Sequence, residues 1–218
     1  MNESLTLAHL AFAVVVAAFL GSIPVAYLVA RVHGVNVFET GTRQAGATNV
    51  FREVGPRSGV VVFAADAFKG GLAILIANWA GLSGSWLLLP AFAAVMGHWN
   101  SPMTRFRGGD GVSTALGVGV VIAPLAVLIP IVVGVLVTGA LLTVSSHPTL
   151  WGGLAGYTAF LGMSMLERIN IGPVTVLGLT AIGVSILLHS AFYHRRHLGP
   201  PEGAALKDRE LSEAPNQR

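Results

Sequence analysis

The sequence predicts an all-α integral membrane protein, a polytopic bundle of about seven transmembrane helices, two of them short. Of its 218 residues, 53% are hydrophobic and only 11% are charged, whereas average soluble domains carry roughly 25% charged residues. A soluble domain of this size buries too small a fraction of its surface to hide so much apolar area. The 27 glycines agree with a membrane bundle, because helices in lipid pack through small residues.

Seven apolar runs define the expected helices. They fall at about 5–30, 57–80, 86–98, 111–122, 124–143, 148–165 and 171–193. A span needs about 20 apolar residues, so the third and fourth runs are short, which is tolerated where the backbone lines a cavity. Pro124 divides a stretch that is too long for one span. Five or six spans would also fit the hydropathy, if some of the short runs do not cross.

The basic residues of the loops predict the orientation. Four arginines lie in the 31–57 loop, two in the 99–110 loop and two after the last run, while the alternate loops carry almost none. With seven spans in the cell membrane, these segments share the cytoplasmic, active face, the N-terminus lies outside and the C-terminus is cytoplasmic. Residues 1–198 would form one transmembrane domain, and the polar segment 199–218 a disordered cytoplasmic tail.

The first polar segment, 41–52, carries groups that suit a phosphate. Its hydroxyls, amide and guanidinium come from Thr42, Thr48, Asn49 and Arg52. Such donors bind phosphate oxygens well, and the small residues between them let the backbone approach a ligand closely. The alternative is an ordinary basic loop that enters the second helix.

The second segment is a glycine-rich turn before the fourth apolar run. Arg105 and Arg107 precede the turn, which contains Gly108, Gly109 and Gly111. A helix that begins after such a turn presents free N–H groups and the positive end of its dipole, which favours an anion. The alternative here is a flexible cytoplasmic turn.

The remaining polar residues leave further alternatives open. The basic third segment, 194–197, ends the last run, where such residues ordinarily anchor a helix at anionic headgroups. Asp66 and Lys69 share a helix face inside the second run and indicate either function or a structural ion pair. His98, taken alone, indicates an interfacial polar residue. No cluster of His, Asp or Glu has metal-ligand spacing, so neither a metal nor another cofactor is expected.

Together these segments resemble the acyl-phosphate:glycerol-3-phosphate acyltransferase family of bacterial phospholipid synthesis, the PlsY type, with this chain as a divergent member. The matching residues are Gly21-Ser22-Ile23-Pro24, the Gly-Ala-Thr-Asn-Val-x-Arg run at 46–52, Asp66-x-x-Lys69-Gly70, Gly97-His98, the glycine-rich segment 105–114, and His194-Arg195. That family has seven helices and three cytoplasmic motifs, so the resemblance implies the same topology.

The resemblance implies acyl transfer from a fatty acyl phosphate to the 1-hydroxyl of glycerol 3-phosphate, giving lysophosphatidic acid without metal or coenzyme A. It implies contact with membrane lipids, a partner enzyme that generates acyl phosphate, and no nucleic acid. The catalytic residues would be His194 and Asn49. The residues that bind the substrates and their phosphates would be Thr42, Thr48, Arg52, Lys69, Arg105, Arg107, Gly108, Gly109 and Gly111.

Several residues depart from the family pattern, so a function other than acyl transfer remains an alternative. Gln44 replaces a family asparagine, Asp110 replaces a lysine in the glycine-rich turn, and Arg196-His197 replaces Glu-Asn. The anion at position 110 favours a non-catalytic or repurposed member that binds a lipid, a metabolite or a membrane partner, whereas the intact 46–52 run favours the enzyme. Asp110 could instead point away from the ligand and cap the helix that follows, since aspartate is a good N-cap. A transporter is a third alternative, although the sequence shows no inverted repeat.

Overall fold

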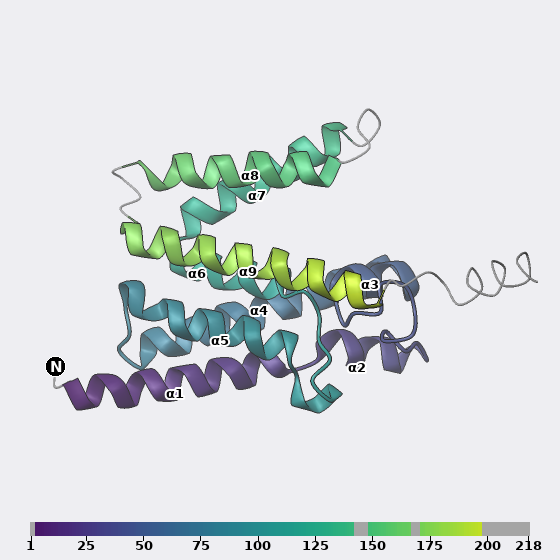
Figure 1. Ribbon diagram of the computed structural model, residues 1–218, viewed down its shortest axis with the longest axis horizontal. Coiled ribbons are helices and arrows are strands. Elements are labelled where there is room, and N and C mark those ends of the chain that lie inside the picture. Colours follow the sequence, from purple (N-terminus) through teal and green to yellow (C-terminus); the bar gives the residue numbers. More distant parts are fainter. Residues whose placement is uncertain (1–2, 142–147, 167–170, 198–218) are drawn as a thin grey trace, which may run out of the picture.

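The computed structural model describes residues 3–141, 148–166 and 171–197, and within these ranges its regular secondary structure is helical (Figure 1). The α-helices are α1 (Glu3–Ser22), α2 (Val25–Val32), α3 (Ala47–Glu53), α4 (Pro56–Trp79), α5 (Leu88–Trp99), α6 (Val112–Ile122), α7 (Pro124–Leu141), α8 (Pro148–Ser164) and α9 (Pro173–His197). Two short 3-10 turns are η1 (Gly84–Leu87) and η2 (Pro102–Thr104). The all-α prediction is confirmed for the described residues, and the expected tail at 199–218 lies outside them.

Each apolar run coincides with a helix or with a broken pair of helices. Three segments are long and apolar enough to cross a membrane, namely Leu7–Val32, Pro56–Trp79 and Pro173–Phe192. Four helices (α4, α7, α8 and α9) begin at a proline, which suits the first position of a helix because its N–H has no partner there. The number of spans and their orientation stay predictions.

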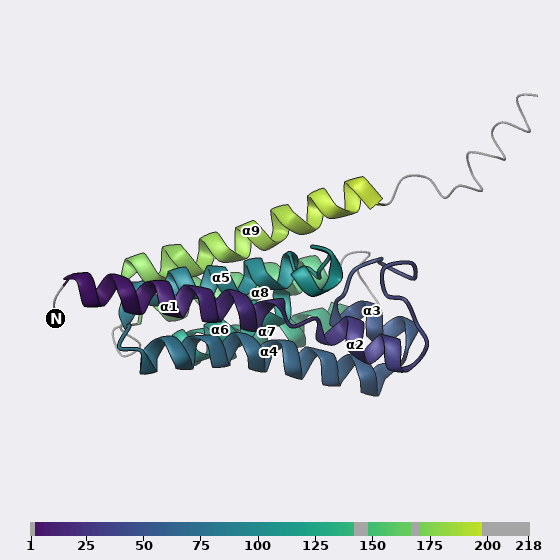
Figure 2. The same cartoon turned by 90° about the horizontal axis from the view of Figure 1, so that it is seen from below.

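The helices lie side by side along one axis (Figures 1 and 2). In Figure 2, α9 runs along one side of the molecule and α4 along the opposite side, with α5 and α6 between them. Helices α7 and α8 form a hairpin at the edge of the bundle (Figure 1). The end of α9 and the helices α2 and α3 lie at the end of the bundle opposite the N-terminus.

The core combines fully buried aliphatic side chains with close helix contacts. Ile74 of α4, Val95 of α5 and Val118 of α6 belong to one buried cluster. Helices α4 and α6 approach so closely that a Cβ on Gly117 would lie 2.6 Å from the carbonyl carbon of Ala67. Outward positions of α1 carry large apolar residues such as Phe12, as a lipid-facing surface requires.

The first span is not one continuous helix. It breaks between α1 and α2 at Ile23-Pro24, where proline lacks the N–H that would continue the hydrogen-bond ladder. The two loops that follow α2 and α5 enter the same end of the bundle as this break. They carry the polar segments singled out in the sequence.

Gly117→Ala should test the close contact between α4 and α6. The new methyl group would force the two helices apart, and overpacking of this kind costs about 1–3 kcal/mol, so the melting temperature in detergent should fall by several degrees. Gly162→Ala in α8 is the matched control, because a Cβ there meets no atom within 4 Å. Equal melting temperatures for the two variants would contradict the packing described.

Candidate functional site

The first two polar segments are in direct contact. The backbone N–H of Ala45 donates a hydrogen bond to the carbonyl oxygen of Gly108 (3.1 Å). The Arg107 guanidinium donates to the carbonyl oxygen of Phe38 (3.1 Å) and lies 4.3 Å from the centre of the Phe38 ring. The loop 33–46 and the loop 100–111 therefore form one surface at this end of the bundle.

Asn49 organises the first of these loops. Its side chain is only 1% exposed. Its Oδ1 accepts the backbone N–H of Thr42 (3.0 Å), and its Nδ2 donates to the carbonyl oxygens of Val37 (2.9 Å), Thr40 (3.2 Å) and Gln44 (2.9 Å). Because both ends of the amide already have backbone partners, the geometry favours a positioning role for this residue, and its catalytic assignment stays a prediction.

Helix α3 presents two of the predicted phosphate ligands on one face. Thr48 and Arg52 are four residues apart, so they lie on the same side of the helix, and both are exposed. Asn49 and Val50 occupy the opposite, buried side. The hydroxyl and the guanidinium are therefore presented together, away from the packing that holds α3 in place.

The glycine-rich turn is packed too tightly for side chains at 108 and 109. A Cβ on Gly109 would lie 2.5 Å from Nε2 of His98, and one on Gly108 would lie 2.5 Å from the Trp99 carbonyl oxygen. The Trp99 indole N–H donates to the carbonyl oxygen of Asp110 (2.6 Å). His98 and Trp99 thus form the floor of the turn, whereas the sequence alone indicated only an interfacial role for His98.

Two features fix where the turn enters α6. Gly111 has a left-handed backbone (φ +86°), a conformation that favours glycine. Asp110 Oδ1 accepts the backbone N–H of Val112, the first residue of α6 (3.1 Å). Gly111 is the N-cap residue of α6, so the Asp110 carboxylate forms a local turn one residue before the cap, near the helix N-terminus where a negative charge is favourable.

The approach to the turn contains a strained segment. Arg105 and Phe106 are consecutive non-glycine residues with positive φ (57° and 60°), a conformation that costs roughly 1–2 kcal/mol per residue. The Phe106 N–H donates to the Ser101 carbonyl oxygen (2.8 Å), and the Thr104 hydroxyl donates to the Arg107 carbonyl oxygen. These contacts stabilise the change in chain direction that brings Arg107 against the first loop.

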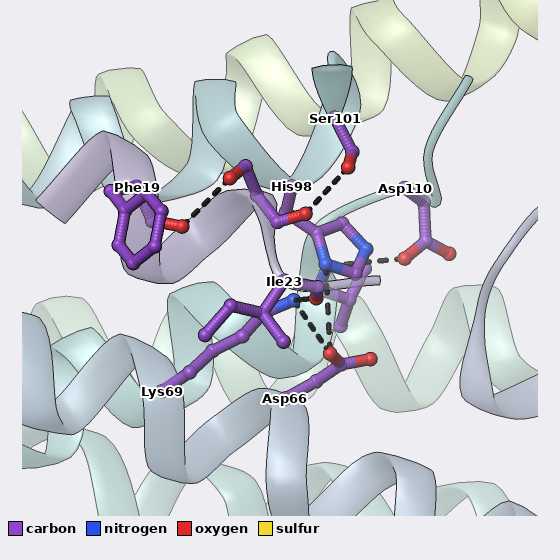
Figure 3. Close-up of polar contacts among 9 residues, drawn as sticks. Phe19, Ile23, Asp66, Lys69, His98, Ser101 and Asp110 are labelled. Carbon is purple, nitrogen blue, oxygen red and sulfur yellow. Dashed lines mark hydrogen bonds and ion pairs between the residues drawn. The ribbon is translucent and has the colours of Figure 1, made fainter. Parts of the chain in front are cut away.

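A buried polar cluster lies behind the turn (Figure 3). The Lys69 ammonium is 2.8 Å from Asp66 Oδ1 and donates a hydrogen bond to the Ile23 carbonyl oxygen (2.8 Å) at the break between α1 and α2. His98 Nδ1 lies 3.7 Å from the same Asp66 oxygen. The Ser101 hydroxyl donates to the Ser22 carbonyl oxygen (2.5 Å). The cluster thus provides partners for the carbonyl groups on the N-terminal side of Pro24.

This geometry favours the structural alternative for the ion pair. Lys69 is 5% exposed, and its ammonium already has two protein partners. It does not lie on the exposed face that carries Thr48 and Arg52. Its assignment as a phosphate ligand stays a prediction that the present contacts do not favour.

Helix α9 brings the third segment to the same end of the molecule. The His189 ring stacks on Trp99 with centroids 4.4 Å apart and an interplanar angle of 5°, which places α9 next to the floor of the glycine-rich turn. His194 lies in the last turns of α9, but its side chain is outside the described residues. The stack between Trp99 and His189 joins residues distant in sequence and has no local sequence signal.

Gln44 is a candidate ligand that the sequence indicated only as a departure. It is 5% exposed, and its Nε2 is buried without a hydrogen-bond partner among the described residues. A buried donor of this kind is rare in a folded protein. It lies next to Ala45, the residue that joins the first loop to the glycine-rich turn, so a ligand at this junction would satisfy it.

Comparisons with known proteins agree with this arrangement. The model of the glycerol-3-phosphate acyltransferase family matches residues 11–198. A glycerol-3-phosphate acyltransferase of Geobacter metallireducens is 44% identical over 110 residues, which are 50% of this chain and 57% of that protein. One of Geobacter sulfurreducens is 33% identical over 164 residues, 72% of this chain and 84% of that protein. The matched part thus spans little more than half of the first relative.

A solved structure extends the likeness to the fold. It is the glycerol 3-phosphate form of PlsY, an integral membrane glycerol 3-phosphate acyltransferase, with a TM-score of 0.70, 27% identity, and coverage of 93% of this chain and 97% of that one. The family match includes both contacting loops, the glycine-rich turn and the apolar helices that carry them. The chain is therefore an integral membrane protein that belongs to the glycerol-3-phosphate acyltransferase family.

Proposed function

We propose that the chain transfers a fatty acyl group from an acyl phosphate to the 1-hydroxyl of glycerol 3-phosphate, giving lysophosphatidic acid for phospholipid synthesis. The observation that carries this proposal is the junction between the first loop and the glycine-rich turn. A buried amide, Gln44 Nε2, lies at this junction at the end of an apolar bundle and has no hydrogen-bond partner in the part of the chain that the structure describes. This arrangement suits substrates that combine a phosphate with a lipid chain.

The chemistry needs little from the protein beyond positioning. An acyl phosphate is already activated, so the substrate hydroxyl attacks the acyl carbon and the phosphate leaves without a covalent enzyme intermediate. Catalysis then rests on holding two anions together and stabilising developing charge. The hydroxyl proton passes to a phosphate oxygen or to the imidazole of His194.

The predicted site residues take distinct roles in this proposal. Thr48 and Arg52 bind a phosphate from α3, and Arg105 and Arg107 add positive charge. Backbone N–H groups of the glycine-rich turn bind the second anion. Thr42, Asn49 and Lys69 act through the loop and the buried cluster that they hold in place.

The topology belongs to the same proposal. We place the end of the bundle that carries α3 and the C-terminal end of α9 in the cytoplasm, with seven spans in the cell membrane and the N-terminus outside. The arginine-rich segments gather at this end (Figure 1), which agrees with the bias of basic residues toward the cytoplasm. Residues 1–198 form the catalytic domain, and a separate enzyme supplies the acyl phosphate.

A direct assay tests the proposal. The purified protein would be incubated with glycerol 3-phosphate and, in turn, acyl phosphate, acyl carrier protein loaded with the same chain, and acyl coenzyme A. The expected result is lysophosphatidic acid from acyl phosphate, with one phosphate released per product. Binding of glycerol 3-phosphate without turnover of any donor would instead support a non-catalytic member, the function class that Asp110 favours.

Reporters of topology should agree with the shared cytoplasmic face. Fusions that end after Arg52, Arg107 and Arg196 should each give a cytoplasmic signal, because all three segments are basic and belong to the proposed active end. Alkaline phosphatase and a fluorescent protein make a complementary pair of reporters. A periplasmic signal at any one position would contradict the proposal that the three segments share the cytoplasmic face.

Arg52 substitutions should impair the use of glycerol 3-phosphate. A bidentate contact between arginine and phosphate is hard to replace, and a charge-assisted hydrogen bond contributes about 1.5–3 kcal/mol. We expect the KM for glycerol 3-phosphate to rise about tenfold in Arg52→Lys and up to about a hundredfold in Arg52→Ala. Arg57→Ala, an exposed arginine at the start of α4, is the matched control. Unchanged KM values in both Arg52 variants would remove the residue from the site.

Substitutions at Asp110 should separate its hydrogen bond to Val112 from its charge. Asp110→Asn keeps an oxygen for the Val112 N–H and should retain both stability and activity, whereas Asp110→Ala should lose about 1 kcal/mol of stability with this hydrogen bond. Asp110→Lys should change the KM for an anionic substrate several-fold, a shift of about 1 kcal/mol. If the wild type were inactive and became an acyltransferase only with lysine at this position, the proposal that the natural chain is an acyltransferase would be rejected.

A further inference from the structure

One stripe of residues holds helix α9 against α5. Its members are Gly178, Ile182, Ile186 and His189, which follow one another at spacings of three or four residues and therefore lie on one face of the helix. Gly178 leaves no room for a side chain against the start of α5. Ile182 and Ile186 are buried in the same cluster as Trp99, the last residue of α5. The stripe thus follows α5 to the level of the glycine-rich turn.

His189 is the last described side chain of this stripe. Its ring stacks on Trp99 with centroids 4.4 Å apart and an interplanar angle of 5°, whereas Ala191 and Phe192 beyond it are exposed. His194 follows five residues later, about 7.5 Å further along the helix at a rise of 1.5 Å per residue. The stack therefore fixes the direction in which α9 leaves the bundle, and with it the place of the His194 backbone.

The same indole ring also holds the glycine-rich turn. Trp99 is 7% exposed, and its N–H donates to the carbonyl oxygen of Asp110 (2.6 Å). A Cβ on Gly111 would lie 2.7 Å from the indole nitrogen, so the turn lies directly against the ring. Phe92 meets the ring edge-on, with centroids 6.2 Å apart. One rigid side chain thus joins the glycine-rich turn to the helix that carries the third polar segment.

We propose that Trp99 and His189 are positioning residues that set the distance between the glycine-rich turn and His194. The inference rests on the proposed function, in which the turn binds an anion and His194 is a proton acceptor. Stacked rings have a preferred separation and tilt, and the N–H in the plane of the same indole fixes the turn. Misplacing a reacting group by 1 Å can cost about a hundredfold in rate. Loss of the stack should therefore lower kcat even where the fold persists.

Kinetic variants test the stack. His189→Ala removes it and should lower kcat with acyl phosphate and glycerol 3-phosphate about tenfold, whereas His189→Phe keeps a planar ring and should restore kcat to within about threefold of the wild type. Leu188→Ala is the matched control, because Leu188 is the adjacent residue of α9 and is 54% exposed, and it should leave kcat unchanged. A wild-type kcat in His189→Ala would overturn the inference.

A double-mutant cycle distinguishes positioning from general destabilisation. If His189 acts through His194, His189→Ala should lower kcat about tenfold in the wild-type background but less than about twofold in a His194→Gln background, because the group to be positioned is then absent. A purely structural role would lower kcat by the same factor in both backgrounds. That result would also overturn the inference.

Spin labels follow the position of α9 without any turnover. The sequence contains no cysteine, so labels can be placed at Phe68→Cys and Ala191→Cys, two exposed positions of α4 and α9. These helices lie on opposite sides of the molecule (Figure 2). The distance distribution from pulsed dipolar spectroscopy should broaden in His189→Ala and should match the wild type in His189→Phe. An unchanged distribution in His189→Ala would contradict the positioning role.

Trp99→Phe separates the two contacts of the indole. It keeps an aromatic face for His189 and removes the N–H that holds Asp110, so the label distances should stay while kcat falls. A wild type that uses no acyl donor would overturn the proposed function, and with it the kinetic role of the pair. An active wild type in which His189→Ala changes neither kcat nor the label distances would overturn the inference alone.

Discussion

The carbonyl groups freed by a break in a membrane helix must find partners within the protein, and this requirement organises the chain. At Ile23 the partner is the Lys69 ammonium, whose charge is balanced by Asp66. His98 contacts the same carboxylate and lies beneath Gly109. The break in the first span is thus connected through side chains of α4 and α5 to the turn that carries the proposed anion site. Removal of either charge would leave its partner buried alone, at a cost of about 3–5 kcal/mol.

The two loops of the site are rigid for different reasons. The first is held from inside by one amide, Asn49, which takes the place of regular secondary structure by bonding four backbone groups. The second is held from below by His98 and Trp99 and contains the strained pair Arg105-Phe106. Strain of this kind persists only where surrounding contacts over-determine the backbone. A site that works by positioning benefits from such loops, because little of its geometry has to form when the substrate binds.

Hydropathy predicted the positions of the long helices closely, because lipid imposes length and composition on each span. The pairing of Asp66 with Lys69 also followed from their spacing, and the structure confirms it at 2.8 Å. The short helix α3 was missed, since the 46–52 run is polar and has no apolar periodicity. The burial of His98 and the stack of Trp99 on His189 could not be derived, because they depend on how separate helices meet. For Asp110 the sequence left a helix-capping role open; the structure places Gly111 at the N-cap and the Asp110 carboxylate on the N–H of Val112, a bond that depends on the backbone of the turn.

An apolar groove runs between α6, α7, α8 and α9, and the exposed position of Leu187 on its wall affects how binding there must be quantified. A ligand of this groove exchanges with the surrounding lipid and not with bulk water. Its effective concentration is therefore a mole fraction in the bilayer or micelle. Adding detergent at constant total substrate would lower the mole fraction of the ligand in the bilayer or micelle. The apparent Michaelis constant would then rise without any change in the protein. Surrounding lipids would compete for the same walls, so saturation would depend on membrane composition as much as on the amount of substrate supplied.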